Sequence, residues 1–142
     1  MGFDPHSKSY KQYEGYVNWH LPWDWKGLRG WAGHTAFQAT GGGMWVNRVR
    51  GNLVSAGPLA SIEGAGGLLS IHAGFRPTLI SRIRFRDLNL GTRLQFPSHI
   101  GILIRPLPHL AVGWRLQHMS NGGLDTHNPG VNLSTFEVRA EW

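Results

Sequence analysis

The final part of the chain, from Gly113 to Trp142, alternates between apolar and polar side chains in a way that few folds accommodate. Successive side chains of a β-strand point to opposite faces, so the alternation predicts two strands joined by a loop. In the first strand, Trp114 and Leu116 share an apolar row, while Arg115 and Gln117 lie in the other row. The apolar row of the second strand is Phe136, Val138, Ala140 and Trp142. Its alternate row is charged, which is typical of a strand with lipid on one side and a polar lumen on the other.

The composition favours the same class of protein. Charged residues make up 15% of the chain, against about 25% in a typical soluble domain. The sequence has no run of roughly 18 apolar residues, which excludes a transmembrane helix. The net charge of +6 favours an anionic partner such as nucleic acid or phosphorylated lipid. No signal peptide is recognisable in the first ten residues, so an exported protein would be represented here in mature or truncated form.

Seven strands can be read from the pattern: five cover residues 9–23, 31–40, 52–63, 67–75 and 91–104, and two lie in the final part. Outer-membrane barrels of bacteria close with an even number of strands. We therefore predict an all-β, antiparallel up-and-down transmembrane β-barrel of eight strands, the eighth lying around residues 76–90 or belonging to an N-terminal strand that the chain lacks. Residues 1–8 are predicted to be a mobile N-terminus, and residues 9–142 a single barrel domain.

Two glycine-containing stretches predict local interruptions of the strands. Gly41, Gly42 and Gly43 predict a flexible loop that runs through Arg48 and Arg50. No nucleotide-binding pattern surrounds this triplet, so a phosphate-binding role is not predicted. Residues 57–58, Gly-Pro, predict a bend or bulge within their strand.

His118 and Ser120 continue the outward row of the strand that contains Trp114. Because they are two residues apart, their side chains emerge on one face, with roughly 6–7 Å between their backbones. A hydroxyl becomes a nucleophile when a neighbouring imidazole takes its proton, and a third group usually orients that imidazole. The backbone amides of Asn121, Gly122 and Gly123 could stabilise an oxyanion, since glycine permits tight conformations. Taken alone, this short pair also fits a strand end without any catalytic role.

Arg82, Arg84 and Arg86 alternate with apolar neighbours, which predicts a row of arginines on one side. Guanidinium groups bind phosphate oxygens in bidentate fashion, so the row suits the head group of an anionic lipid. An ordinary solvated basic face fits the pattern equally well. The eight histidines are scattered, without Cys or a metalloprotease spacing, so no zinc site is predicted.

Several short motifs together resemble one protein family. They are HMSN at 118–121, NPG at 128–130, LGTRLQF at 90–96, SHIG at 98–101 and SAGP at 55–58. The stretch from about residue 50 to the end resembles the outer-membrane lipid A 3-O-deacylases (PagL). This resemblance implies an eight-stranded membrane barrel that hydrolyses the acyl ester at the 3-position of lipid A.

The resemblance also implies roles for individual residues. Ser120 is the nucleophile, His118 the general base and Asn121 a helper at the oxyanion site, and all face the lipid. It implies no metal or cofactor. The expected partners are lipid A or lipopolysaccharide and other lipids of the bacterial outer membrane, with no nucleic acid. The oligomeric state is left open between monomer and homodimer.

The chain departs from this family at one position. The family has an acidic residue that orients the histidine where this chain has Asn132. Asn132 shares parity with Phe136 and is expected on the outward side, whereas Glu137 should point into the lumen. Asp125, in the loop, is the other acid that could approach the histidine. An asparagine can orient a histidine but does not stabilise the imidazolium as a carboxylate does.

Three functions remain open from the sequence. The leading one is an outer-membrane esterase in which Ser120, His118 and Asn132 act on lipid A. The second is a non-catalytic outer-membrane barrel with a degenerate site that serves in structure or lipid binding. The third is a soluble lipocalin-like barrel, which would bury its apolar rows inside.

Overall fold

Antiparallel strands make up most of the computed structural model, which describes residues 2–3, 10–27, 30–46, 48–86 and 88–140. The long strands are β2 (Tyr10–His20), β4 (Ala32–Val46), β5 (Val49–Gly64), β6 (Leu69–Phe75), β11 (Ser98–Leu107), β12 (Leu110–Met119) and β13 (Val131–Ala140). The short ones are β1 (Gly2–Phe3), β3 (Trp25–Lys26), β7 (Thr78–Ile80), β8 (Arg84–Phe85), β9 (Leu88–Asn89) and β10 (Leu94–Gln95). A 3-10 turn, η2 (Ala65–Gly67), joins β5 to β6. Among the described residues, no helix has the length and apolarity needed to cross a membrane.

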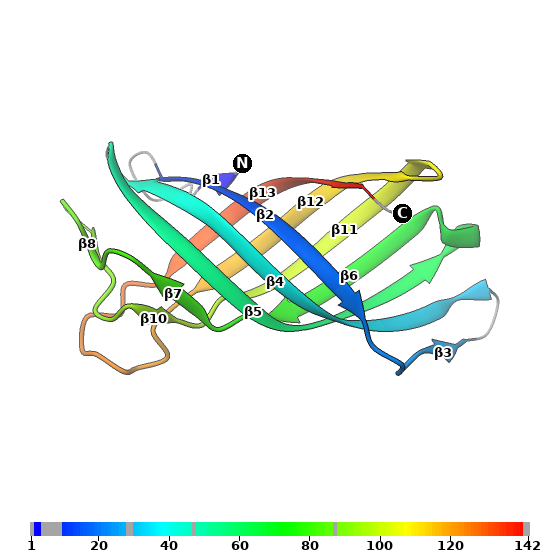
Figure 1. The fold of residues 1–142 in the computed structure, drawn as a ribbon, viewed down its shortest axis with the longest axis horizontal. Helices are drawn as coiled ribbons and strands as arrows, with labels where there is room; N and C mark the ends of the chain where they lie inside the picture. Colours follow the sequence, from blue (N-terminus) through cyan, green and yellow to red (C-terminus); the bar gives the residue numbers. More distant parts are fainter. Residues whose placement is uncertain (1, 4–9, 28–29, 47, 87, 141–142) are drawn as a thin grey trace.

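The strands form one sheet that closes on itself, and they run obliquely side by side in Figure 1. The order is β10-β7-β5-β6-β11-β12-β13-β1-β2-β4-β3, and the pairing of β4 with β5 closes the ring. β7 resumes the line of β6 after Arg76 and Pro77, because both pair with β5. β10 and β11 are likewise separated by Phe96 and Pro97. Counted this way, the described residues give the ring eight positions.

The eighth position is β1, which lies between β13 and β2. Gly2 and Phe3 are therefore placed in a strand, which differs from the predicted mobile terminus. Residues 1 and 4–8 lie outside the described residues, as does Trp142. Both predictions for the eighth strand are wrong: residues 76–90 hold β7 and the separate β8–β9 hairpin, and the N-terminal strand is present as β1.

The distribution of side chains is the reverse of that in a soluble barrel. Trp19, Leu116 and Val138 are 54%, 57% and 57% exposed on the outer face, whereas Arg76 and Arg115 are 0% and 2% exposed. The large exposed apolar residues of β11 and β13 are Ile100, Ile102, Ile104, Leu107, Phe136 and Val138. This arrangement matches the expected lipid-facing row and polar lumen. It contradicts the lipocalin-like alternative, which requires an apolar interior.

Ion pairs fill the lumen and compensate for the burial of its charges. Glu14 Oε2 lies 3.1 Å from Arg76 Nη1 and 3.0 Å from Arg115 Nη2. Glu137 Oε1 lies 3.3 Å from Arg115 Nη1, and its Oε2 lies 3.1 Å from His72 Nε2. A buried charge is tolerated when it is paired and hydrogen-bonded, so this network replaces the apolar core that a soluble domain would have.

Two stretches that contain glycine differ from their predictions, because a neighbouring backbone sets their geometry. Gly41–Gly43 do not form a loop; they lie within β4, which pairs continuously with β2. A Cβ at Gly42 would lie 2.2 Å from the carbonyl oxygen of Tyr13, so glycine here permits a close approach between strands. Gly57 and Pro58 do not form a bulge, since β5 keeps one register with β4 throughout, but β5 does bend along its length, as Figure 1 shows. The irregularity lies in the partner strand, at the break between β6 and β7.

An apolar cluster supports the end of the barrel where β12 ends and β13 begins. It contains Met44, Val46, Leu53, Ile80, Phe85, Leu90, Met119, Val131 and Leu133. Met119 and Val131 are paired directly across β12 and β13, one residue beyond the pair His118 and Asn132. Because strand side chains alternate, the cluster anchors the inner face while His118 and Asn132 remain outside.

Candidate active site

His118 and Asn132 face each other on the outside of the barrel. They are register partners across β12 and β13, and both side chains are exposed. His118 Nδ1 lies 2.7 Å from Asn132 Oδ1. A carboxamide oxygen only accepts hydrogen bonds, so Nδ1 carries the proton and Nε2 keeps its lone pair. The asparagine thus fixes the tautomer in which Nε2 can act as a base.

Ser120 lies just past the end of β12 and is half-buried. Its carbonyl oxygen accepts a hydrogen bond of 2.7 Å from the N–H of Phe96, which fixes the backbone where the strand gives way to the loop. Among the described residues, no hydrogen bond joins the Ser120 hydroxyl to His118. Such bonds are often loose without substrate, and the two residues lie two positions apart at the same outward rim.

Asn121 organises the loop that follows Ser120. Its side chain is fully buried, and its amide Nδ2 donates to the carbonyl oxygens of Leu90 at 3.2 Å and His127 at 2.8 Å. Its Oδ1 accepts from the N–H of Gly123 at 3.0 Å. Every hydrogen of this amide is therefore used within the protein. This differs from the predicted oxyanion role, because a donor already engaged twice has none to offer a substrate.

Two other hydrogen-bond donors lie close to Ser120 in the sequence of this loop, the side-chain amide of Asn128 and the backbone N–H of Gly122. The N–H of Asn121 donates to Asn128 Oδ1 at 3.0 Å, which orients the exposed Asn128 amide next to the residue that follows Ser120. The Gly123 N–H is engaged by Asn121, whereas the Gly122 N–H takes no part in the hydrogen bonds that organise the loop. Sequence reasoning missed Asn128 as a site residue. The signal was its place in the NPG motif.

Sequence reasoning also missed Gly130, where a side chain would press against the imidazole of His118. Its φ is +65°, a left-handed conformation that favours glycine. A Cβ at this position would lie 3.1 Å from His118 Cε1. The last residue before β13 therefore limits where the imidazole can lie.

Neither alternative acid contacts the histidine. Asp125 Oδ1 accepts from the N–H of His127 at 2.7 Å and lies 3.6 Å from His127 Nδ1. Glu137 is buried in the lumen with Arg115 and His72, as its parity predicted. Within the described part of the chain, no group of three His, Asp or Glu side chains could hold a metal ion.

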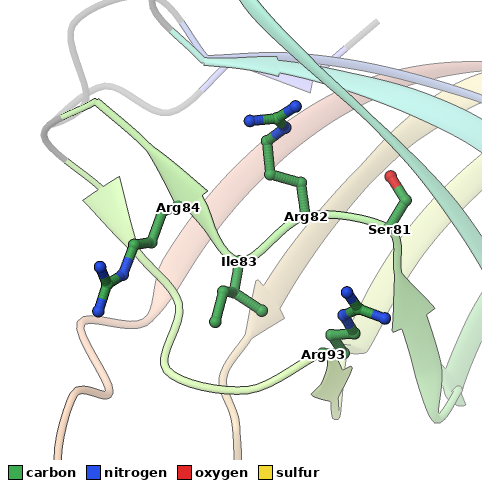
Figure 2. A pocket seen from close by; sticks show the side chains of 5 residues that line it. All are labelled: Ser81, Arg82, Ile83, Arg84 and Arg93. Atoms are coloured by element: carbon green, nitrogen blue, oxygen red, sulfur yellow. The ribbon is translucent and has the colours of Figure 1, made fainter.

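The predicted arginine row is only partly gathered. Arg82 and Arg84 line a surface hollow with Ser81, Ile83 and Arg93 (Figure 2). Arg86 is not part of this lining, and its backbone has a left-handed φ of +48° that takes it out of the row. Arg93 takes its place in the cluster. Arg93 directly precedes β10 and reaches the cluster because β10 pairs with β7. No local sequence pattern predicts that pairing.

Comparison with known proteins identifies the family and the fold. A family model described as lipid A 3-O-deacylase (PagL) matches residues 11–141, which is nearly the whole chain. The chain belongs to the lipid A 3-O-deacylase (PagL) family. One curated relative, lipid A deacylase PagL of Pseudomonas aeruginosa, is 31% identical over 121 residues, covering 78% of this chain and 69% of the relative.

Two further matches to PagL proteins differ in how much of the chain they cover. Lipid A deacylase PagL of Bordetella bronchiseptica is 36% identical over 63 residues, which span 44% of this chain and only 35% of the relative. A crystal structure of the outer membrane enzyme PagL superposes with a TM-score of 0.82 at 24% identity, covering 92% of this chain and 90% of that one. The likeness to that structure shows a shared barrel fold. Exposed apolar rows around a charged lumen are typical of a barrel that is surrounded by lipid.

Proposed function

We propose that this PagL family member is an ester hydrolase that removes the 3-O-linked acyl chain of lipid A. The observation that carries the proposal is the 2.7 Å contact between His118 Nδ1 and Asn132 Oδ1, which leaves Nε2 as a base on the lipid-facing side. Ser120 lies two residues further along the same rim. An ester in the outer leaflet can reach this pair without entering the lumen.

The reaction follows from these positions. The Ser120 Oγ attacks the ester carbonyl carbon, and His118 Nε2 takes the hydroxyl proton. The N–H of Gly122 and the amide of Asn128 stabilise the negative charge that develops on the carbonyl oxygen. Collapse of this intermediate breaks the bond between the acyl carbon and the 3-oxygen of the sugar. His118 gives its proton to that oxygen, which leaves as the 3-hydroxyl. Water, deprotonated by His118, then hydrolyses the acyl-serine and releases the fatty acid.

The amide at position 132 favours the non-catalytic alternative. A neutral amide orients the imidazole but does not balance the positive charge that forms when His118 takes the proton. We therefore expect hydrolysis that is slower than a carboxylate would support, rather than an inert barrel.

The test is release of 3-hydroxy fatty acid from lipid A in detergent micelles. The wild-type chain should release it, and Ser120→Ala should not, with both proteins showing the same shift in gel mobility on boiling. Release that survives in Ser120→Ala would remove the serine from the mechanism. Absence of release from the wild-type chain, but not from Asn132→Glu, would support the degenerate-site alternative.

A further inference from the structure

The hollow lined by Arg82, Arg84 and Arg93 is a second feature of the barrel end that carries the candidate active site. Its volume is about 310 Å³, and Ser81 and Ile83 complete the lining. Figure 2 shows Arg82 between β7 and β8, Arg84 at the start of β8 and Arg93 just before β10, with their guanidinium groups spread around Ile83. Three arginines therefore line one hollow, and its lining contains no acid.

The described residues provide no ion pair for these arginines, and all three are exposed. The backbone around them is nevertheless fixed. Ser81 is tied to Asn52 twice, by Ser81 N–H to Asn52 O at 2.9 Å and by Asn52 N–H to Ser81 Oγ at 2.8 Å. The N–H of Ile80 donates to the carbonyl oxygen of Arg93 at 2.9 Å. Since the Ser81 hydroxyl accepts from the backbone, its own proton is free to donate into the hollow.

Guanidinium and hydroxyl donors that have no acceptor among the described residues favour a compact anion with several oxygens. A phosphate monoester carries up to two negative charges and three terminal oxygens, which suits the planar donor fork of arginine. A carboxylate has two oxygens and one charge, and would leave most of these donors without an acceptor.

The hollow and the candidate active site share one segment, residues 90–96. The carbonyl oxygen of Leu90 accepts from Asn121 Nδ2, and the N–H of Phe96 donates to the carbonyl oxygen of Ser120. Arg93 lies between these two anchors. In Figure 1 the β7–β10 region and the loop after β12 lie together at one end of the barrel, and β3 lies at the other. A single amphiphile can therefore present an ester at Ser120 and a charged head group at the hollow.

We propose that Arg82, Arg84, Arg93 and Ser81 bind a phosphate monoester on the sugar head group of the lipid A molecule whose ester meets Ser120. The inference rests on the proposed function for the identity of the lipid. The phosphate holds the disaccharide against the rim, so that the ester at the 3-position is presented to Ser120 and the acyl chains stay in the bilayer.

The test measures binding in detergent micelles with Ser120→Ala protein, so that turnover plays no part. Phosphorylated lipid A is compared with the same lipid after enzymatic removal of its phosphate monoesters. The triple variant Arg82→Gln, Arg84→Gln, Arg93→Gln should bind the phosphorylated lipid about tenfold to a hundredfold more weakly, as expected for loss of charge-assisted hydrogen bonds at an exposed site. Binding of the dephosphorylated lipid should not change.

Arg86→Gln is the control matched in charge to Arg93→Gln alone, since it removes one arginine close to the hollow but outside its lining, and it should bind both lipids as the parent does. Arg93→Gln alone, checked for folding by gel mobility, keeps the test valid if the triple variant does not fold. Equal weakening for both lipids, or none for either, would overturn the proposal. So would inorganic phosphate binding to the arginines while lipid phosphorylation makes no difference. Hydrolysis by the wild-type chain is read separately, so a failure of the proposed activity is distinguishable.

Discussion

His118 and Asn132 are bonded across two neighbouring strands on the outside of the barrel, with 2.7 Å between Nδ1 and Oδ1. The strand register makes them direct partners, and the buried pair Met119 and Val131 beside them anchors the inner face. The orientation of the imidazole therefore depends on the barrel wall itself rather than on a flexible loop. An amide occupies the position at which the resemblance in sequence implies an acid.

Changing Asn132 tests what this bond contributes. Asn132→Ala should lower the hydrolysis rate by about 10²-fold, since a general base that is no longer held in place loses most of its effect. Asn132→Glu should raise the rate, at most by about 10⁴-fold, because a carboxylate also stabilises the imidazolium. Asp125→Asn should have little effect, because Asp125 is bonded to His127. Initial rates of fatty-acid release provide the measurement; a loss with Asp125→Asn equal to that of Asn132→Ala would contradict it.

Gly130 and Gly66 provide a matched pair for the packing of His118. Both have φ near +65°, so an alanine strains the two backbones alike. A Cβ at Gly130 would press against His118 Cε1, whereas nothing lies within 4 Å of one at Gly66. Gly130→Ala should therefore reduce hydrolysis while Gly66→Ala does not, at similar thermal stability. The prediction fails if both variants lose activity in proportion to their loss of stability.

The lumen network should carry stability rather than chemistry. Glu14→Gln removes the partner of two buried arginines, Arg76 and Arg115, which should lower the free energy of unfolding by about 3–5 kcal/mol. The control is Glu63→Gln, which loses a half-exposed pair with Arg105 and should cost about 1 kcal/mol or less. Urea unfolding followed by gel mobility compares the two. Equal costs would show that the lumen pair is not buried.

The middle of each strand should lie deeper in the lipid bilayer than its ends. Ile102→Arg, in the middle of β11, should destabilise the barrel by about 2–4 kcal/mol in a bilayer, whereas Leu107→Arg at the end of the strand should cost about 0–1 kcal/mol. Both side chains are exposed on the outer face. Unfolding in lipid vesicles measures the difference. No dependence on position would argue against a membrane-spanning β11.

The sequence predicted the sides of the barrel wall well, because strand parity is a local property. Alternation placed His118 and Asn132 outside and Glu137 inside, and the structure places them there, whereas Ser120 follows the end of β12 and is half-buried. The prediction failed where a neighbouring strand sets the conformation of the backbone. The glycines at 41–43 read as a loop, although they permit the close approach of β2 to β4.

The rest of the site depends on contacts between distant segments, which no local pattern records. Asn121 was expected to face the substrate, but Leu90, distant in the sequence, takes one of its amide hydrogens. Arg93 joins Arg82 and Arg84 only because β10 pairs with β7. Arg86, whose alternation matched theirs, leaves the row at a turn with positive φ.

The most direct test of the central claim is mass spectrometry of lipid A from Gram-negative cells that express the chain in their outer membrane. We predict a new lipid A species that lacks the mass of one 3-hydroxyacyl group, with an exposed hydroxyl at the 3-position. The species should be absent with Ser120→Ala and with His118→Ala, although both proteins are folded and present in the membrane. Unaltered lipid A in cells with the folded wild-type barrel, or the same loss of mass with either variant, would contradict a serine–histidine deacylase.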